Sequence, residues 1–380
     1  MRDIPFVDPY LDEREMNAVI EVMKSHYLVE GKYSRDFERK FSEFTGAKHS
    51  IICNNGTAAL HLALESLDMP PGAEVITTPF TFIATSNSIL FGGLVPKFVD
   101  VDSETWNLDP HLVESAITEK TKAIMPVHIF GLAADMKHLR EIAEKHDLHL
   151  IEDAAQGFGA RIDGKHVGSF GDVATFSMYA TKNLISGEGG VVTTNNDEIA
   201  EKLDSLKNHG RTIEGGYRHV RVGFNYRLTD MQGAVASIQM DKAEEILSRR
   251  KVNAEFYRSV VDGIDGLEYQ KTPTGFDHGN YIFALDTRKI GMKPSEAVDS
   301  FKADHVLARP IYNKLSYEQE NFKAINDWRW AKVIDYPDYS KVKCPVSEEI
   351  SRNHFEIPVV PSLNDEEREK VAQTIRKVFT

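Results

Sequence analysis

Short apolar segments alternate with longer helix-like segments through the first half of this sequence, and the alternation restricts the folds open to the chain. Strands are expected at residues 50–54, 74–80, 95–102, 121–131, 148–156, 174–179 and 189–194. Strands separated by helices indicate βαβ units, in which helices cover both faces of a parallel sheet. The pattern therefore predicts an α/β fold with a mostly parallel, seven-stranded sheet flanked by helices.

Several of the helices are marked by apolar spacing or by a capping residue. The helix expected at residues 11–25 has one apolar face, made of Met16, Val19, Ile20 and Met23. The next, at residues 34–45, has Phe37, Phe41 and Phe44 on one side. Asp135 is the expected N-cap of a helix that runs to Lys145, because its side chain accepts hydrogen bonds from free backbone N–H groups.

The regular alternation of strands and helices ends after about residue 230. A long helical region at 230–264 is followed by a strand-like segment at 281–287, a helix near 294–304, a second strand-like segment at 306–312 and a capped C-terminal helix at 362–379. This mixture indicates a smaller α+β domain. We therefore expect a large domain at 1–244 and a small C-terminal domain at 245–380.

Charge and cysteine content exclude several classes of function. The formal net charge is −13, which opposes nucleic-acid binding, because a phosphate backbone selects clustered Lys and Arg. Cys53 and Cys344 form no metal-binding motif, and His146 and His149 lack the partners of a metal site, so no metal is expected. No apolar run resembles a secretion signal or a membrane span. A cytoplasmic protein without membrane or nucleic-acid partners is expected.

Chemically useful side chains follow the ends of several expected strands. Ligands of open α/β sheets bind beyond the carboxyl ends of their strands. Gly56 and Thr57 begin a helix after one strand, where free N–H groups and the helix dipole favour an anion. Asp153 ends another strand, Lys182 follows a third in a glycine-rich turn, and Ser177 offers a hydroxyl beside it.

An anion cradle, an acid and a lysine together match pyridoxal 5′-phosphate (PLP). The lysine amine would form a Schiff base with the aldehyde, and the acid would keep the ring nitrogen protonated. Phe82, at another strand-to-helix junction, is the candidate for stacking on the ring. Each residue alone has a common structural explanation, as a solvated lysine, a helix cap or a core phenylalanine, but their joint order favours the cofactor.

Two glycine-rich stretches raise the alternative of a dinucleotide site. GFGAR (157–161) and GEGG (187–190) faintly resemble nucleotide-binding loops. Neither completes the GxGxxG pattern followed by an acidic residue, so a Rossmann dinucleotide site is not expected.

The chain resembles the DegT/DnrJ/EryC1/StrS family of PLP-dependent aminotransferases over nearly its whole length. The resemblance rests on NGTAALHLAL, EVITTPFTFIAT, VPKFVDVD, KAIMPVHIFG, LIEDAAQGFGA, GSFGDVATFSMYATKNLISGEGG, GFNYRLTDMQGAVA and IPVVPSLNDEE. It implies PLP-dependent transferase fold type I, the fold of aspartate aminotransferase. It also implies a homodimer with shared active sites.

Roles for individual residues follow from this resemblance. Lys182 matches the catalytic Schiff-base lysine, Asp153 the partner of the ring nitrogen, and Gln156 the glutamine near the ring oxygen. The remaining matches are Phe82 to the stacking aromatic, Gly56, Thr57 and Ser177 to the phosphate cup, and Asn225 to a residue that reaches the neighbouring subunit's phosphate. Met178 stands where the family usually has an aromatic residue, which is expected to change packing beside the cofactor.

The implied reaction transfers an amino group from an amino acid, expected to be L-glutamate, to a keto group of a nucleotide-linked deoxyhexose, with pyridoxamine 5′-phosphate as the intermediate form of the cofactor. Some relatives carry histidine in place of the lysine and act as sugar dehydratases, so Lys182 favours transamination. A dehydratase and a non-catalytic regulatory relative are the alternatives. Arg309 and Tyr312 are plausible sugar contacts outside the expected site.

Overall fold

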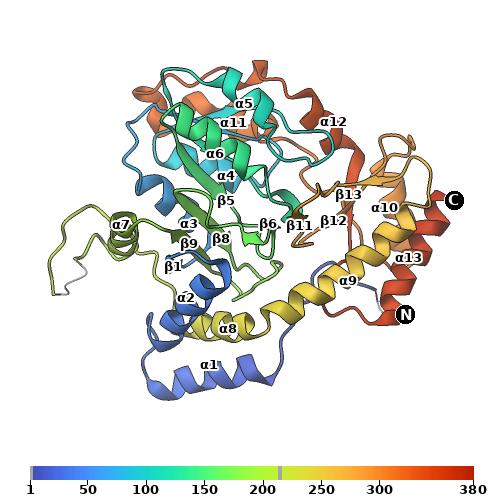
Figure 1. Cartoon of the computed structure of the whole chain (residues 1–380), viewed down its shortest axis with the longest axis horizontal. Helices are drawn as coiled ribbons and strands as arrows, with labels where there is room; N and C mark the ends of the chain where they lie inside the picture. Colours follow the sequence, from blue (N-terminus) through green and yellow to red (C-terminus); the bar gives the residue numbers. More distant parts are fainter. Residues whose placement is uncertain (1–2, 213–215) are drawn as a thin grey trace.

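A seven-stranded sheet forms the centre of the larger part of the molecule in the computed structural model, which describes residues 3–212 and 216–380 (Figure 1). Its strands, in spatial order, are β1 (His49–Cys53), β9 (Gly190–Thr194), β8 (Val173–Ser177), β5 (His149–Asp153), β4 (Thr121–Met125), β2 (Glu74–Thr77) and β3 (Val95–Phe98). Among these seven strands, β9 alone runs in the opposite direction to the other six. The prediction of a mostly parallel, seven-stranded α/β sheet is confirmed.

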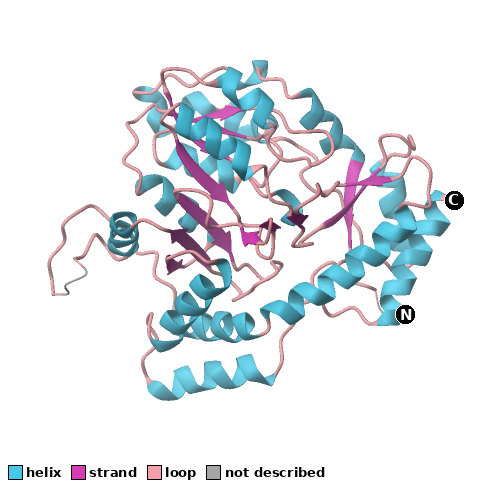
Figure 2. Cartoon of the chain, in the orientation of Figure 1, coloured by secondary structure: helices cyan, strands magenta, loops and turns pink. Residues whose placement is uncertain are grey.

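Helices cover both faces of this sheet (Figure 2). One face packs against α2 (Lys32–Thr45), α5 (Pro110–Ala116), α6 (Met136–Lys145) and α8 (Asp230–Asp241). The other packs against α3 (Gly56–Glu65), α4 (Ala84–Phe91) and α7 (Asp197–Lys207). Successive strand residues alternate between the two cores, as with Ile51 and Ile52, because side chains of a strand point to opposite faces.

Local signals account for the ends of these helices. Asp135 caps α6 as expected, since its side chain accepts a hydrogen bond from the backbone N–H of His138. Asn364 and Glu367 form a capping box at the start of α13 (Asp365–Phe379). Phe37 and Phe41 of α2 are fully buried in the sheet core, and Phe44 packs at its edge.

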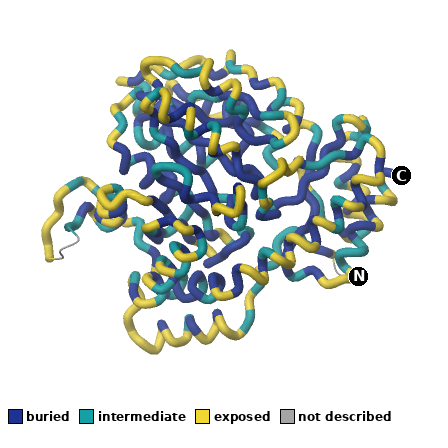
Figure 3. The backbone as a smooth tube through the Cα atoms, in the orientation of Figure 1, coloured by how far each residue is buried: buried dark blue, intermediate teal, exposed yellow. Residues whose placement is uncertain are grey.

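Helix α1 (Glu13–Ser25) packs in an unexpected orientation. Its apolar side chains Met16, Ile20 and Met23 are 60%, 47% and 53% exposed, and Val19 is half-buried. The opposite side, with Ala18 and Val22, packs against α8. Figure 3 shows that much of this helix, at the bottom of the view, is exposed. The apolar face of α1 is therefore left uncovered by the chain itself.

The C-terminal part contains a second core. Helix α9 (Ala243–Val261) leads to a three-stranded sheet of β10 (Glu268–Tyr269), β12 (Phe283–Asp286) and β13 (His354–Ile357), which packs with α10 (Pro294–Ala303) and α13. The strand expected at 306–312 is wrong: this segment makes only isolated bridges, from Val306 to Ile4 and from Arg309 to Glu356. The domain boundary near residue 245 falls in the first turn of α9 and stays a prediction.

The remaining elements are short. A small sheet consists of β6 (Arg161–Ile162), β7 (Lys165–His166) and β11 (Phe276–Asp277). Residues between β12 and β13 form α11 (Glu320–Lys323), α12 (Pro345–Asn353) and single turns at Ser316–Glu318, Ile325–Asp327, Arg329–Lys332 and Tyr339–Lys341. A further turn spans Ile129–Gly131. Within residues 3–212 and 216–380, no helix has the length and apolar character needed to cross a bilayer.

Candidate active site

A cleft of about 1060 Å³ opens at the carboxyl ends of β1, β2, β5 and β8. The structure brings seven of the eight predicted site residues to its walls: Gly56, Thr57, Phe82, Asp153, Gln156, Ser177 and Lys182. The eighth, Asn225, is exposed outside this cleft and forms an isolated backbone bridge with Asn208. Its expected role in a neighbouring subunit stays a prediction.

The start of α3 forms a cradle for an anion. Asn55 is the N-cap, and its side-chain oxygen accepts a 2.8 Å hydrogen bond from the N–H of Ala58. The N–H groups of Gly56 and Thr57 have no hydrogen-bond partner within the described chain. Ser177 lies directly against Gly56, where an added Cβ would come within 2.8 Å of the Ser177 Cβ. Glycine is therefore needed for the serine hydroxyl to reach the helix N-terminus.

Asp153 supplies a buried carboxyl group at the end of β5. Only 2% of the residue is exposed, and Oδ2 accepts a 2.6 Å hydrogen bond from the Thr85 hydroxyl while Oδ1 accepts one from the N–H of Ala155. Burial raises the pKa of Asp153, and the hydrogen bonds and the positive charge of Lys182 oppose that rise. A cation brought into the cleft beside this group would favour its ionised form.

Lys182 lies in the turn between β8 and β9, and its amine faces an aromatic ring. The Nζ atom is 4.3 Å from the ring centroid of Tyr281, whose hydroxyl is 3.1 Å from the Thr181 hydroxyl. The turn is closed by a 2.9 Å hydrogen bond from the N–H of Lys182 to the carbonyl of Tyr179. No carboxylate of the described residues lies within ion-pair distance of the amine. The lysine thus presents an amine to the cleft without an ionic partner.

Two further side chains face the same space. The carbonyl oxygen of Gln156 accepts a 3.0 Å hydrogen bond from the N–H of Phe130, and its amide nitrogen makes no hydrogen bond within the described part of the chain and borders the cleft. Phe82 is 57% exposed although it borders the cleft. An unused amide donor and an uncovered aromatic face are what a flat, polar-edged ring requires. Met178 is fully buried in the sheet core and does not line the cleft.

These features fit PLP. The cradle at α3 suits its phosphate, the Asp153 carboxyl its ring nitrogen, the Gln156 amide its ring oxygen and the Phe82 face its ring. The Lys182 amine suits its aldehyde.

Sequence reasoning missed several residues of the cleft. Thr85, Tyr281 and Val7 line it without having been expected there. Arg309 and Tyr312, which were expected as sugar contacts outside the site, line the same cleft. Tyr312 has φ of +47°, a conformation that is uncommon for a bulky side chain and is found most often where function requires it. No local spacing connects Thr85, Tyr281 and Val7, so these three positions could not be predicted from sequence patterns.

The fold and the cleft define an α/β enzyme of PLP-dependent transferase fold type I. A model of the DegT/DnrJ/EryC1/StrS aminotransferase family matches residues 9–376, and the chain belongs to this family. It is therefore a PLP-dependent aminotransferase, as the sequence predicted.

Individual relatives agree with this assignment. GDP-perosamine synthase from Caulobacter vibrioides is 38% identical over 323 residues, which cover 83% of this chain and 86% of that protein. A pleiotropic regulatory protein from Geobacillus stearothermophilus is 36% identical over 365 residues, or 96% and 94% of the two chains. The crystal structure of DesV from S. venezuelae, in complex with ketimine intermediate, matches with a TM-score of 0.90 at 32% identity, covering 99% and 98%.

Proposed function

We propose that this protein transfers the amino group of L-glutamate to a keto carbon of a nucleotide-linked deoxyhexose, using PLP. One observation carries the proposal: Asp153, Lys182 and the Gly56–Ser177 cradle line the same cleft although they come from different strands. The relation to a synthase of a GDP-linked sugar supports the substrate class.

The side chains of this cleft would hold the cofactor in a fixed position. Gly56, Thr57 and Ser177 bind the phosphate, while Phe82 covers one face of the ring and excludes water from it. Asp153, ionised beside the ring nitrogen, holds a proton on that nitrogen, and Thr85 fixes the carboxylate by its hydrogen bond. PLP, when bound, supplies an electron sink for the pair left behind when a Cα proton departs.

Lys182 has two roles in this proposal. Its amine attaches the cofactor when no amino donor is present. Once the donor has displaced it, the free Nζ removes the proton from the donor Cα as a general base and returns a proton as a general acid. The Tyr281 ring, 4.3 Å from Nζ, stabilises the ammonium group that forms when the amine takes this proton.

The role of Lys182 is tested by borohydride reduction of the PLP-loaded protein followed by peptide mass spectrometry. We expect the cofactor mass on the peptide that contains Lys182, and we expect Lys182→Ala to lose both this adduct and amino transfer. Lys314→Ala, which removes a surface lysine paired with Glu320, is the matched control and should retain both. Turnover by Lys182→Ala would refute the assignment.

The two alternative functions are separated by a product assay. With L-glutamate and a keto sugar nucleotide, a transaminase forms 2-oxoglutarate in step with the amino sugar, whereas a dehydratase does not. The similarity to a pleiotropic regulatory protein makes a regulatory role the second candidate. A protein with that role would bind PLP but would form neither 2-oxoglutarate nor an amino sugar.

We also propose a homodimer in which Asn225 reaches the neighbouring phosphate. The uncovered apolar face of α1, continued by Tyr27, Leu28 and Val29, supports a protein partner at this surface. Ile20→Glu should shift the protein to monomers in analytical ultracentrifugation. A wild-type monomer with full activity would contradict the proposal.

The free, buried thiols of Cys53 and Cys344 support a reducing compartment, and we propose a cytoplasmic location.

A further inference from the structure

Arg250, on helix α9, is a buried arginine without an acidic partner. The residue is 4% exposed, and the side chain that interacts with its charge is Tyr281 and not a carboxylate of the described residues. Burial lowers the pKa of Arg250 to about 10, so the guanidinium stays charged near neutral pH. A buried charge without a counter-ion destabilises a fold unless hydrogen bonds compensate it. A role beyond packing is therefore expected for this arginine.

The hydrogen bonds of Arg250 go to the segment that carries Tyr281. Its Nη1 donates to the carbonyl of Tyr281 at 3.1 Å and to that of Asn280 at 3.4 Å. The ring of Tyr281 lies over the Lys182 amine, with 4.3 Å from Nζ to the ring centroid. Helix α9 thus holds the backbone from which this ring reaches the lysine.

Asn183, directly after Lys182, holds the same segment. Its Nδ2 donates to the carbonyl of Gly279 at 2.7 Å and to that of Phe158 at 3.0 Å. Because both of these partners are acceptors, the remaining atom of the amide is its oxygen, Oδ1. Oδ1 is buried and has no hydrogen-bond partner among the described residues, and the same holds for Nε of Arg250. One acceptor and one donor are therefore left unused.

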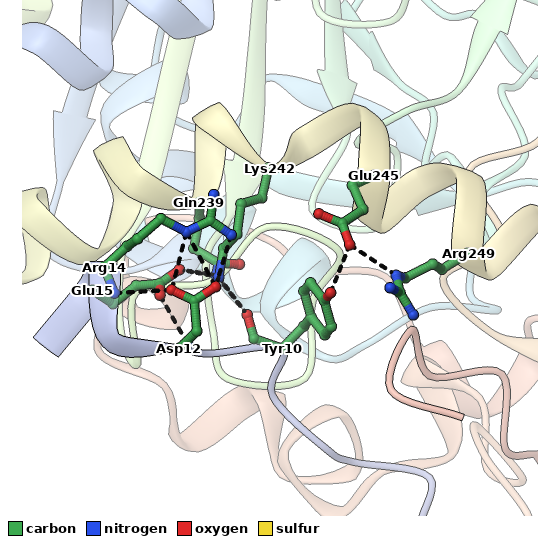
Figure 4. Close-up of polar contacts among 8 residues, drawn as sticks. All are labelled: Tyr10, Asp12, Arg14, Glu15, Gln239, Lys242, Glu245 and Arg249. Carbon is green, nitrogen blue, oxygen red and sulfur yellow. Dashed lines mark hydrogen bonds and ion pairs between the residues drawn. The ribbon is translucent and has the colours of Figure 1, made fainter. Parts of the chain in front are cut away.

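These two side chains line a cavity of about 10 Å³, which is room for one water molecule. The lysine-bearing turn (180–183) forms one wall of the cavity, and Tyr10 contributes to another. Hydrogen bonds from Gln239 and Lys242 to the Tyr10 carbonyl fix this second wall (Figure 4). A water molecule in the cavity can accept a hydrogen bond from the guanidinium and donate one to the amide oxygen.

We propose that Arg250 is a positioning residue for Lys182, which fixes the Tyr281 ring against the lysine amine together with one water molecule bound between Arg250 Nε and Asn183 Oδ1. This inference rests on the proposed transaminase function, in which the ring stabilises the ammonium group that forms when the lysine takes a proton. A ring that is held less firmly lies over the amine for less of the time. Proton transfer then slows, while binding of the amino donor does not change.

The experiment compares PLP-loaded wild-type protein with Arg250→Met and Arg250→Lys. A single turnover with L-glutamate, without sugar, is followed by release of 2-oxoglutarate, with hydrogen or deuterium on Cα of the donor. For Arg250→Met we expect the maximal rate to fall about tenfold and the half-saturating L-glutamate concentration to change less than about twofold. The deuterium effect should be at least as large as in the wild-type protein, because the slowed step is transfer of the Cα proton. Arg250→Lys keeps a donor for the carbonyls and should fall between.

Lys251→Met is the matched control, since Lys251 is the next residue of α9, is exposed and pairs with Glu255 outside the cavity. It should match the wild-type protein in rate and in deuterium effect. Retention of the PLP adduct on Lys182 shows that each variant has an intact cofactor site. Arg250→Met is expected to fold, because it removes a buried charge and keeps an unbranched apolar side chain. If it does not fold, Arg250→Lys takes the same tests.

A double variant decides whether Arg250 acts through the ring. Tyr281→Leu should be slow, and Arg250→Met/Tyr281→Leu should be no slower than Tyr281→Leu alone. Losses that multiply in the double variant would overturn the positioning role, and so would a slow Arg250→Met without a deuterium effect. A high-resolution crystal structure should show the water molecule within hydrogen-bond distance of Arg250 Nε and Asn183 Oδ1, and a cavity without it would refute that part of the proposal.

Failure of the proposed function is distinguishable from failure of this inference. If the wild-type protein releases no 2-oxoglutarate, the proposed function fails, and the crystal structure of Arg250→Met then tests the positioning role by itself. A Tyr281 ring that has moved away from Lys182 Nζ in this variant supports the role. A ring in its wild-type place refutes it.

Discussion

The Thr85 hydroxyl donates a 2.6 Å hydrogen bond to the buried Asp153 carboxyl, and it joins the first turn of α4 to the end of β5. The Thr81 hydroxyl lies 2.9 Å from that of Thr85, so a short chain of hydroxyls leads to the acid. Hydrogen bonds to a carboxylate favour its ionised form, against the burial that raises the pKa of Asp153.

Asp153→Asn should reduce amino transfer by about 100-fold or more, because an amide cannot stabilise a charged ring nitrogen in a desolvated site. Steady-state rates measure the loss, and mass spectrometry of the reduced protein should still find the cofactor on Lys182. Thr85→Val should cost much less, since the carboxyl remains. Equal losses in both variants would mean that the hydroxyl, and not the charge of the acid, dominates.

Gly56→Ala should weaken PLP binding by on the order of tenfold, because the new methyl group overpacks the cradle against Ser177. Equilibrium dialysis of the apoprotein with PLP measures the affinity. The matched control is Gly263→Ala, where the nearest atom to an added Cβ is 3.4 Å away. If both glycine variants bind PLP equally well, the close approach of Ser177 has no role in the cradle.

His278 should make the protein less stable in mild acid. Burial lowers the pKa of His278 to about 3, and its Nδ1 accepts a 2.8 Å hydrogen bond from the N–H of Asn280. An unfolded histidine titrates near 6.5, so below that pH the unfolded state binds more protons and the free energy of unfolding falls. For this residue the loss by pH 5 is about 2 kcal/mol.

Urea unfolding at pH 7 and pH 5 tests this prediction for His278. His278→Gln should lose less stability than the wild-type protein between the two pH values. Burial also lowers the pKa values of His166 and His354 to about 4, so part of the acid sensitivity should remain in the variant. An unchanged difference between pH 7 and pH 5 would contradict the assignment to His278.

Lys242→Met should destabilise the fold by about 3 kcal/mol, because it leaves the Glu15 carboxylate buried without its partner. Lys242 is 1% exposed and contacts Glu15, which is 3% exposed, beside the segment that holds Tyr10 and Asp12 (Figure 4). Urea denaturation measures the change. The double variant Lys242→Met/Glu15→Gln should recover much of the loss, and a double variant as unstable as the single one would show that the ion pair is not the cause.

Much of the fold was predictable because its signals are local. Strand-helix alternation, the Asp135 cap and the Phe37–Phe41 spacing each depend on neighbouring residues, and the structure has all of them. The residues that gather at the cleft were also predictable as a group, since consecutive parallel strands end at the same edge of a sheet.

Other features depend on contacts between distant segments. The 306–312 segment has a strand-like composition, but its hydrogen bonds go to single residues such as Ile4 and Glu356, so no ladder forms. The apolar spacing in α1 correctly predicted a helix, but it did not predict which side of the helix would be buried. The side that packs on α8 uses the small residue Ala18. Phe6 reaches Arg309 across most of the chain length, and no local pattern records such a pair.

Strand β9 links the anion cradle to the turn that carries Lys182, although these two parts of the site lie far apart in the sequence. Gly190 pairs with Ser177 on one side and with Cys53 on the other, and a Cβ on Gly190 would fall 2.3 Å from the Asn55 carbonyl oxygen. An insertion between Lys182 and Gly190 that slipped this register would displace the anion cradle together with the lysine. Relatives that act on other substrates are therefore expected to differ in the 309–312 segment, while the length of the lysine-bearing turn stays constant.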